Sequence, residues 1–281
     1  SPSDTGKGRL GQLVKRIYGG CRQESGCRQE SGCRQESRCR RDSQTQAGKQ
    51  TPERGLIMKI GAVTIGQAPR TDVTSDIMHI FDGRVELSQR GGLDGLTVEQ
   101  IAGFKPERDD YVLVSRLTDG TSVTFAERYI LPRLQECINE LEAEGARLIM
   151  FFCTGDFPES LTSNVPLVYP CHILNKVVPL LTKKSSIVTV TPSPLQVGQC
   201  EKKWSNFVDH VKAVPASPYG PWEDLASAAR EIKDMDADLV VLDCIGFTQE
   251  MKDMFAKETG KLVVLPRTLL ARVISELTDV K

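Results

Sequence analysis

The chain has 281 residues, of which 40% are hydrophobic and 26% are charged, and its net charge is −1. This balance gives no reason to expect a nucleic-acid or membrane-surface partner. The sequence has no run of about 18 apolar residues, so no transmembrane helix is predicted. The length suits one large α/β domain or two smaller ones.

The first segment, residues 1–57, is expected to be a disordered, low-complexity N-terminal extension. Four of the nine cysteines recur every six residues in it: Cys21, Cys27, Cys33 and Cys39. A segment with so few large apolar groups cannot bury enough surface to offset its ordering entropy. Zinc binding is the alternative, but zinc sites favour paired ligands about two to four residues apart. We interpret the repeat as an extension in front of a folded protein that begins at Met58.

From Met58 onward, apolar runs alternate with amphipathic stretches. Continuous runs such as LVVLD are typical of parallel strands that are covered on both faces. The predicted strands are 59–65, 146–153, 166–169, 186–191, 210–214, 238–243 and 262–265. The predicted helices are 124–144, 171–182, 195–208, 222–235, 248–258 and 268–277. The segment YVLVSRLTDGTSVTF alternates around Asp119-Gly120, a dipeptide that favours a hairpin turn.

Three matched pairs of segments indicate that the α/β unit occurs twice. ARLIMFFCTGDFPE (146–159) matches ADLVVLDCIGFTQE (237–250) at five of fourteen positions and aligns Cys153 with Cys244. LVYPCHILNKVV (167–178) matches VVLPRTLLARVI (263–274). AVTIGQAP (62–69) matches IVTVTPSP (187–194) and aligns Thr64 with Thr189.

The order of these matches predicts an α/β fold of two pseudo-symmetric parallel-sheet lobes with a cleft between them. The predicted lobes are 58–184 and 185–281, and the last helix is a candidate to pack on the first lobe. The first lobe carries an insertion of 34 residues, roughly LSQRGGLDGL to TDGTSV. A long insertion beside a site is often a lid. The alternative is an oligomer contact, which would suit a homodimer.

Cys153 and Cys244 are the candidate catalytic residues. Each ends a predicted strand, and ligand sites in open α/β sheets lie at that edge. Facing lobes would bring both thiols to one cleft. The alternative is that each cysteine is a small buried hydrophobe, but two cysteines at equivalent strand ends, each followed by x-Gly, favour a functional role.

The residues after each cysteine are candidates to bind a carboxylate. Gly155 and Gly246 permit a tight turn with exposed amide N–H groups, which at a helix start suit an anion. These donors would also lower the pKa of a thiol toward neutral pH. Thr154 and Thr248 add hydroxyl groups, which fit helix caps equally well.

Further candidates follow the first strand. Arg70 suits a carboxylate clamp because its guanidinium fork matches a carboxylate; the alternatives are a surface position or a structural pair with Asp72. Thr64 and Gln67 are expected to line the cleft. Asp156 and Asp243 flank the thiols, where they would orient ligand or cap helices.

Metals and cofactors are not expected. The three histidines, His79, His172 and His210, are isolated in sequence. Neither a P-loop nor a G-x-G-x-x-G after a strand is present. The five cysteines after residue 57 are odd in number and suit no disulfide framework. A reducing cytoplasm is therefore the expected compartment.

The motifs TIGQAPRTDV, LDGL, RLTDGTSV, CTGDF and LDCIGF resemble the AroM family, which is related to the aspartate/glutamate/hydantoin racemase superfamily. The resemblance covers nearly all of residues 58–281 and none of the extension. It implies two similar α/β lobes, a cleft, and cofactor-independent proton transfer by paired thiols. Cys153 is followed by Thr-Gly and Cys244 by Ile-Gly, which departs from the racemase pattern and leaves the substrate open.

Three functions are therefore considered. The first is an isomerase, a racemase or epimerase of a small carboxylate ligand. The second is a lyase or cis–trans isomerase that uses one thiol. The third is a non-catalytic small-acid-binding or metabolic accessory protein that has kept the cleft.

Overall fold

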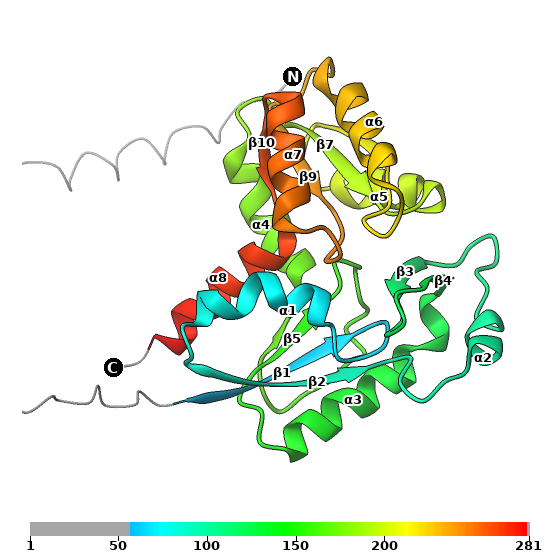
Figure 1. Cartoon of the computed structure of the whole chain (residues 1–281), viewed down its shortest axis with the longest axis vertical. Coiled ribbons are helices and arrows are strands. Elements are labelled where there is room, and N and C mark those ends of the chain that lie inside the picture. The colour runs from blue at the N-terminus through cyan, green and yellow to red at the C-terminus, as the bar shows by residue number, and fades with distance from the viewer. Residues whose placement is uncertain (1–56, 280–281) are drawn as a thin grey trace, which may run out of the picture. The chain divides into compact units, whose positions relative to one another are not determined.

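The computed structural model describes residues 57–279, and the predicted extension with its four cysteines falls outside this part except for Ile57. Two four-stranded parallel sheets form the framework (Figure 1). The first has the order β2-β1-β5-β6, made of β1 (Met58–Thr64), β2 (Val85–Gly91), β5 (Ile149–Phe152) and β6 (Leu167–Val168). The second has the order β10-β9-β7-β8, made of β7 (Ser186–Thr191), β8 (His210–Pro215), β9 (Leu239–Leu242) and β10 (Leu262–Val264).

Both sheets have the same topology. In each sheet, the strand that comes first in the chain lies between the second and the third, and the fourth lies beside the third. This confirms the predicted α/β class with a repeated parallel sheet. The strand register corrects one of the three sequence matches. Val63 pairs with Phe151, and Val190 pairs with Leu242. With Cys153 aligned on Cys244, Thr64 corresponds to Thr191 rather than Thr189. A shift of two residues keeps a side chain on the same face of a strand, so the apolar pattern could not reveal it.

The helices of the described chain lie close to most predicted ranges. They are α1 (Thr71–Ile77), α2 (Val98–Ala102), α3 (Leu131–Ala143), α4 (Pro170–Leu181), α5 (Val197–Trp204), α6 (Trp222–Lys233), α7 (Gln249–Thr259) and α8 (Pro266–Thr278). Short 3₁₀ turns are η2 (Met78–Phe81), η3 (Glu127–Tyr129) and η4 (Pro194–Gln196). Prolines occupy the first turns of α3, α4 and α8. A backbone N–H in the first turn has no acceptor within the helix, so proline loses no hydrogen bond there.

The predicted helix over 124–144 starts too early, because residues 122–126 form a strand. The β-branched β4 (Ser122–Ala126) pairs antiparallel with β3 (Val112–Arg116), which confirms the hairpin. Gly120 has φ +93, a conformation that favours glycine in the turn. The prediction missed β2 because this edge strand is half-exposed and polar, and it missed the short helices α1 and α2.

The insertion in the first lobe begins later than predicted. β2 is the counterpart of β8, so LSQRGG belongs largely to the regular sheet. Residues 92–130, which contain α2 and the β3–β4 hairpin, connect β2 to α3. In the second lobe residues 216–221 connect β8 to α6. The extra chain therefore leaves from the carboxyl end of a strand.

The helices that follow the fourth strands pack on the opposite sheets. Leu270 and Ile274 of α8 share a buried cluster with Ile60 of the first sheet. Leu174 of α4 shares another cluster with Leu239 of the second sheet. Figure 1 shows α8 beside α1. The boundaries 58–184 and 185–281 stay a prediction, and this exchange of helices makes each lobe depend on the other.

Arg267 of α8 carries a buried polar contact between the lobes. Its side chain has no exposed surface. Its Nε and Nη2 donate to the carbonyl of Ile245 at 2.9 and 2.7 Å. Its Nη1 donates to the carbonyl of Asp72 at 2.7 Å and to Asp76 Oδ2 at 2.9 Å. One guanidinium therefore joins α8, α1 and the loop after Cys244.

We expect Arg267→Met to lower the free energy of unfolding by about 3–5 kcal/mol, because it leaves buried acceptors without a donor. Urea denaturation of the full chain measures this change. Arg272→Met on the same helix is the matched control, since Arg272 is exposed, and it should change stability by less than about 0.5 kcal/mol. Equal losses in the two variants would contradict the structural role of Arg267.

Candidate active site

The loops after β5 and β9 open onto one cavity of about 40 Å³. Cys153, Thr154 and Gly155 line it from the first lobe, and Asp243 and Cys244 line it from the second. The two cysteines that the internal repeat aligns therefore share one small space, at the strand ends where α/β sheets bind ligands.

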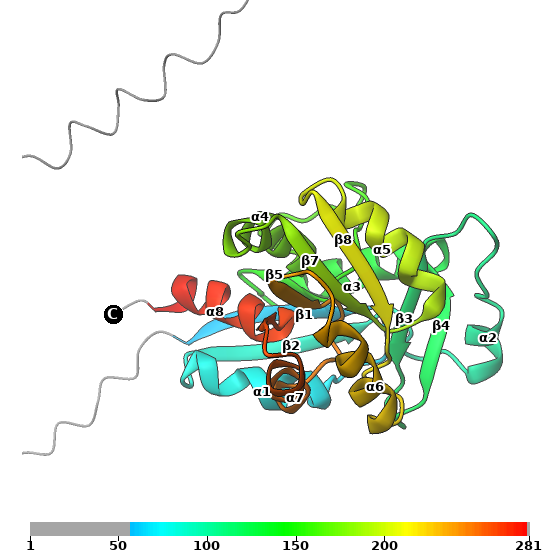
Figure 2. The same cartoon turned by 90° about the horizontal axis from the view of Figure 1, so that it is seen from above.

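The insertion supplies a further wall of the cavity. Tyr111 and Leu113, at the start of β3, line it. The side-chain amides of Gln196 and Gln199 donate to the carbonyl of Val112 at 3.0 and 2.9 Å and so tie β3 to the second lobe. Figure 2 shows the β3–β4 hairpin beyond the ends toward which β7 and β8 point. The insertion therefore lies where a lid over the cavity would lie. That it moves as a lid stays a prediction.

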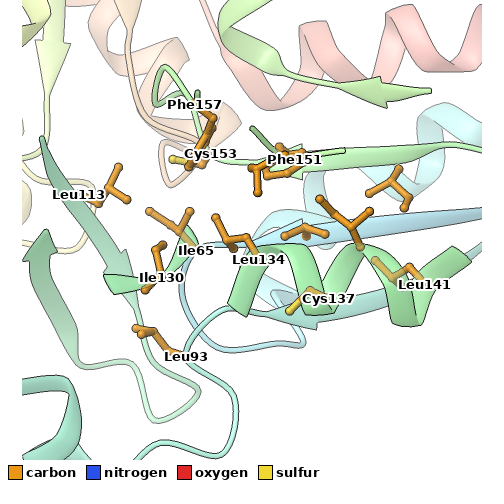
Figure 3. Packing of buried hydrophobic residues seen from close by; sticks show 14 of the residues in the cluster. Ile65, Leu93, Leu113, Ile130, Leu134, Cys137, Leu141, Phe151, Cys153 and Phe157 are labelled. Atoms are coloured by element: carbon orange, nitrogen blue, oxygen red, sulfur yellow. The ribbon is translucent and has the colours of Figure 1, made fainter. Parts of the chain in front are cut away.

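Each thiol accepts an N–H bond from the glycine two residues further along the chain. The distance from the Gly155 nitrogen to the Cys153 sulfur is 3.3 Å, and that from Gly246 to the Cys244 sulfur is 3.4 Å. Both cysteines are buried. Figure 3 shows Cys153 beside Phe157 at the upper edge of an apolar cluster. The two motifs therefore have the same local geometry as well as the same sequence pattern.

The acidity of the thiols is the reverse of the prediction. Burial raises the pKa of Cys153 and of Cys244 above the ordinary value of 9.0, and the glycine N–H groups oppose it only in part. The nearby Arg70 also lowers the pKa of Cys244 somewhat. Desolvation disfavours a thiolate more than one backbone N–H stabilises it. Both groups are therefore thiols at neutral pH.

Arg70 lines the cavity, but its guanidinium group already binds a carboxylate of the chain. Its Nε and Nη2 donate to the two oxygens of Asp72 at 2.8 and 2.7 Å. Nη2 also reaches the Tyr219 hydroxyl at 3.1 Å, and Nη1 reaches Thr64 Oγ1 at 3.4 Å. The structural pair with Asp72 is therefore present, and Arg70 cannot offer a free bidentate face to a ligand.

Tyr219 is a residue of the cavity wall that the sequence did not suggest. The guanidinium carbons of Arg70 and Arg116 lie 6.0 and 5.9 Å from its ring centroid. Burial raises its pKa, so it stays a neutral phenol. A Cβ on Gly246 would come within 2.3 Å of its hydroxyl oxygen. Gly246 therefore provides the space into which Tyr219 fits.

A buried ion pair lines another part of the cavity, and its lysine was also missed. Lys203 Nζ lies 2.6 Å from Asp243 Oδ2. Trp204 Nε1 donates to the same oxygen at 2.8 Å. Burial opposes both charges, but the pairing raises the pKa of Lys203 and lowers that of Asp243. Both groups are therefore charged at neutral pH. Lys203 belongs to no motif, and only the tertiary fold brings it here.

Several predicted ligand-binding residues do not line the cavity. Gln67 accepts bonds from the backbone and hydroxyl of Thr118 in the hairpin. Thr248 caps α7 by accepting from the nitrogen of Met251, the alternative that the sequence left open. Thr64 bonds to Arg70, while its counterpart in the second sheet, Thr191, lines the cavity.

Within residues 57–279, one group of side chains has the spacing of metal ligands: Asp156, Cys171 and His172, with ligand atoms within 4.8 Å of one another. His172 is therefore not isolated in space as the sequence suggested. Asp156 and His172 are exposed, and burial raises the pKa of Cys171 to about 12. Exposed acidic groups with this spacing are common in proteins without an ion, so we assign no metal to this group.

No helix within residues 57–279 has the length and apolarity needed to cross a bilayer.

We expect Gly246→Ala to lower the free energy of unfolding by about 1–3 kcal/mol, because the added methyl group overpacks against Tyr219. Gly155→Ala is the matched control. Its methyl group would meet Leu113 Cδ2 at 3.2 Å and Cys153 Sγ at 3.3 Å, so we expect a loss below about 1 kcal/mol. Thermal unfolding of the two variants measures the difference. A smaller loss for Gly246→Ala than for Gly155→Ala would show that Tyr219 does not depend on this glycine.

The fold is similar to that of several solved enzymes. The maleate isomerase of Pseudomonas putida S16 has a TM-score of 0.54 at 12% identity, over 79% of this chain and 93% of that chain. The glutamate racemase of Aquifex pyrophilus has a TM-score of 0.52 at 18% identity, over 80% and 84%. The allantoin racemase of Klebsiella pneumoniae has a TM-score of 0.55 at 12% identity, over 78% and 87%.

At these identities the similarity establishes the fold, which is that of the aspartate/glutamate racemase-like enzymes. No curated protein sequence matches the chain. The family model described as AroM protein matches residues 60–278. This confirms the resemblance drawn from the motifs, and the chain belongs to the AroM family.

Proposed function

We propose that the chain is an isomerase, a racemase or epimerase of a small carboxylate, that transfers protons between Cys153 and Cys244 without a cofactor. The observation that carries this proposal is the placement of both thiols on one cavity, at corresponding strand ends of two lobes with the same topology. A carbon held between them would face one sulfur on each side.

In the proposed reaction one cysteine acts as thiolate and removes the proton from the carbon next to the carboxylate. The C–H electron pair moves into the carboxylate to give an enolate. The other cysteine, as thiol, gives its proton to the opposite face and becomes the thiolate. One S–H and one C–H bond form as one of each breaks, so only the configuration at carbon changes.

The chain's own groups divide this work. The N–H groups of Gly155 and Gly246 are directed at the sulfurs, so they stabilise whichever cysteine is ionised. They are therefore less suited to the enolate than the sequence suggested. The ammonium group of Lys203 lines the cavity, where it can offset part of the developing negative charge although Asp243 already pairs with it.

One observation favours a second candidate, a small-acid-binding protein without turnover. Burial raises the pKa of both thiols, so neither thiol is a ready base at neutral pH. A one-thiol cis–trans isomerase or lyase is a third candidate, because a maleate isomerase is among the proteins of this fold. The small carboxylate ligand, the homodimer and the cytoplasmic location remain predictions.

The test is solvent-deuterium exchange with the full chain, after a thermal-shift screen of small amino, keto and aromatic acids for ligands. We expect deuterium at the carbon next to the carboxylate, with racemisation. Cys153→Ser and Cys244→Ser should each lower racemisation by about 10²–10⁴-fold, because serine is a poor proton-transfer group at neutral pH. Each variant should still exchange one enantiomer, since one thiol remains.

Cys137→Ser is the matched control, because Cys137 is a buried thiol that does not line the cavity. It should retain wild-type activity. Loss of activity in only one of the two cavity variants would support the one-thiol candidate. Ligand binding without turnover in the wild type and both variants would support the binding protein.

A pH titration tests the state of the thiols directly. Because burial raises the pKa of Cys153 and Cys244 above the ordinary 9.0, thiolate should form only above that pH, and turnover should rise through the alkaline range. The ultraviolet thiolate absorbance of the wild type minus that of each serine variant measures each group. A thiolate signal that titrates near neutral pH would show that burial does not control the acidity of these thiols.

A further inference from the structure

Asp243 has one carboxylate oxygen that the chain leaves without a partner. Its Oδ2 is bonded to Lys203, Trp204 and Cys200 at 2.6, 2.8 and 3.4 Å. Its Oδ1 is buried and has no hydrogen-bond partner. The side chain is only 3% exposed, and the residue lines the cavity. A buried carboxylate oxygen without a donor is unfavourable, which points to a donor supplied by the ligand.

Lys203 places a donor next to this acceptor. Its side chain is 9% exposed, and its Nζ reaches Asp243 Oδ2 at 2.6 Å and the Thr154 carbonyl at 3.4 Å. An ammonium group has three N–H donors, so one of them is left for a ligand. Lys203 also lines the cavity. The ion pair thus offers a ligand one acceptor and one donor side by side.

The charges of the pair restrict what it can bind. A second carboxylate of a ligand would bring negative charge against the free Asp243 oxygen, which is unfavourable in a buried site. A methyl group would leave that oxygen unpaired. A nitrogen that carries N–H satisfies Asp243, and an oxygen atom of the same ligand can accept from Lys203. A nitrogen-bearing acid therefore fits the pair better than a dicarboxylate or a hydrocarbon acid.

We propose that Asp243 and Lys203 form a specificity subsite for an N–H group next to the reacting carbon, so that the substrate is a small amino acid or its N-carbamoyl or N-acyl derivative. This assignment rests on the proposed function for the reaction, but the selectivity that it describes is a property of binding. It can therefore be tested without turnover.

The experiment compares matched ligands on the full chain by calorimetry at neutral pH. The first series is alanine, N-carbamoylalanine, lactate and isobutyrate. These acids carry NH₃⁺, NH, OH and CH₃, respectively, on the carbon next to the carboxylate. The second series is aspartate, N-carbamoylaspartate, malate, methylsuccinate and maleate. We expect the N–H members of at least one series to bind at least about tenfold more tightly than the methyl and hydroxyl members of that series, and in the second series also more tightly than maleate, which has no N–H group.

Asp243→Asn tests the residue itself, because it keeps the shape of the side chain and removes its charge. We expect the tenfold preference to fall to about twofold or less, while isobutyrate or methylsuccinate binds as before. Asp238→Asn is the matched control, since Asp238 accepts hydrogen bonds from Thr182 and Lys183 and does not line the cavity. It should lower stability and leave the preference unchanged.

The outcomes separate this assignment from the proposed reaction. The N–H preference in the wild type, lost in Asp243→Asn, supports the subsite even if no deuterium exchange is found, in which case the isomerase alone is wrong. The subsite is wrong if methyl or hydroxyl members bind as tightly as N–H members, or if no member of either series binds. It is also wrong if Asp243→Asn folds and keeps the full preference. Should this variant fail to fold, the wild-type series still decides.

Discussion

Two buried arginines meet at Asp72, and the geometry of the cavity depends on this contact. The carboxylate of Asp72 binds Arg70, and its carbonyl accepts from Arg267. Arg267 also holds the carbonyl of Ile245, directly after Cys244, while Arg70 reaches Tyr219 from the second lobe. Removal of one partner from such a network leaves uncompensated buried charge. The position of one thiol relative to the other is therefore set by polar contacts between lobes as well as by the two sheets.

The burial that brings the thiols together also makes them weaker acids. Every cation on the cavity wall that could offset this effect is engaged with the chain's own carboxylates, Arg70 with Asp72 and Lys203 with Asp243. An entering carboxylate therefore meets a nearly neutral site and must use the few donors that remain free. The cavity of about 40 Å³ adds a limit on size. Together these features favour a small ligand whose polar groups bind the buried donors and acceptors that the chain leaves without a partner.

The strands and the paired cysteines could be predicted from the sequence because their signals are local. Apolar runs mark strands that are buried on both faces, and the Cys-x-Gly pattern repeats within matching segments. β2 lacked such a signal because an edge strand is half-exposed. Tyr219 and Lys203 could not be found, because their roles depend on partners 149 and 40 residues away in the chain. Arg70 lines the cavity, but sequence alone could not decide between a ligand and Asp72 as its partner.

The two halves of the cavity are alike in backbone and unlike in electrostatics. Burial, the dominant effect, and Asp243 raise the pKa of Cys244, whereas Gly246, Arg70 and Tyr219 lower it. Burial, Cys244, Cys171 and Glu127 raise the pKa of Cys153, whereas Gly155 lowers it. A positive charge stabilises a thiolate, whereas nearby acidic groups disfavour one. The side chains around Cys244 therefore include groups that favour its thiolate, whereas the side chains that act on Cys153 favour its thiol. The repeated fold provides two equivalent positions for sulfur, and the residues that differ between the lobes give the two sulfurs different electrostatic surroundings.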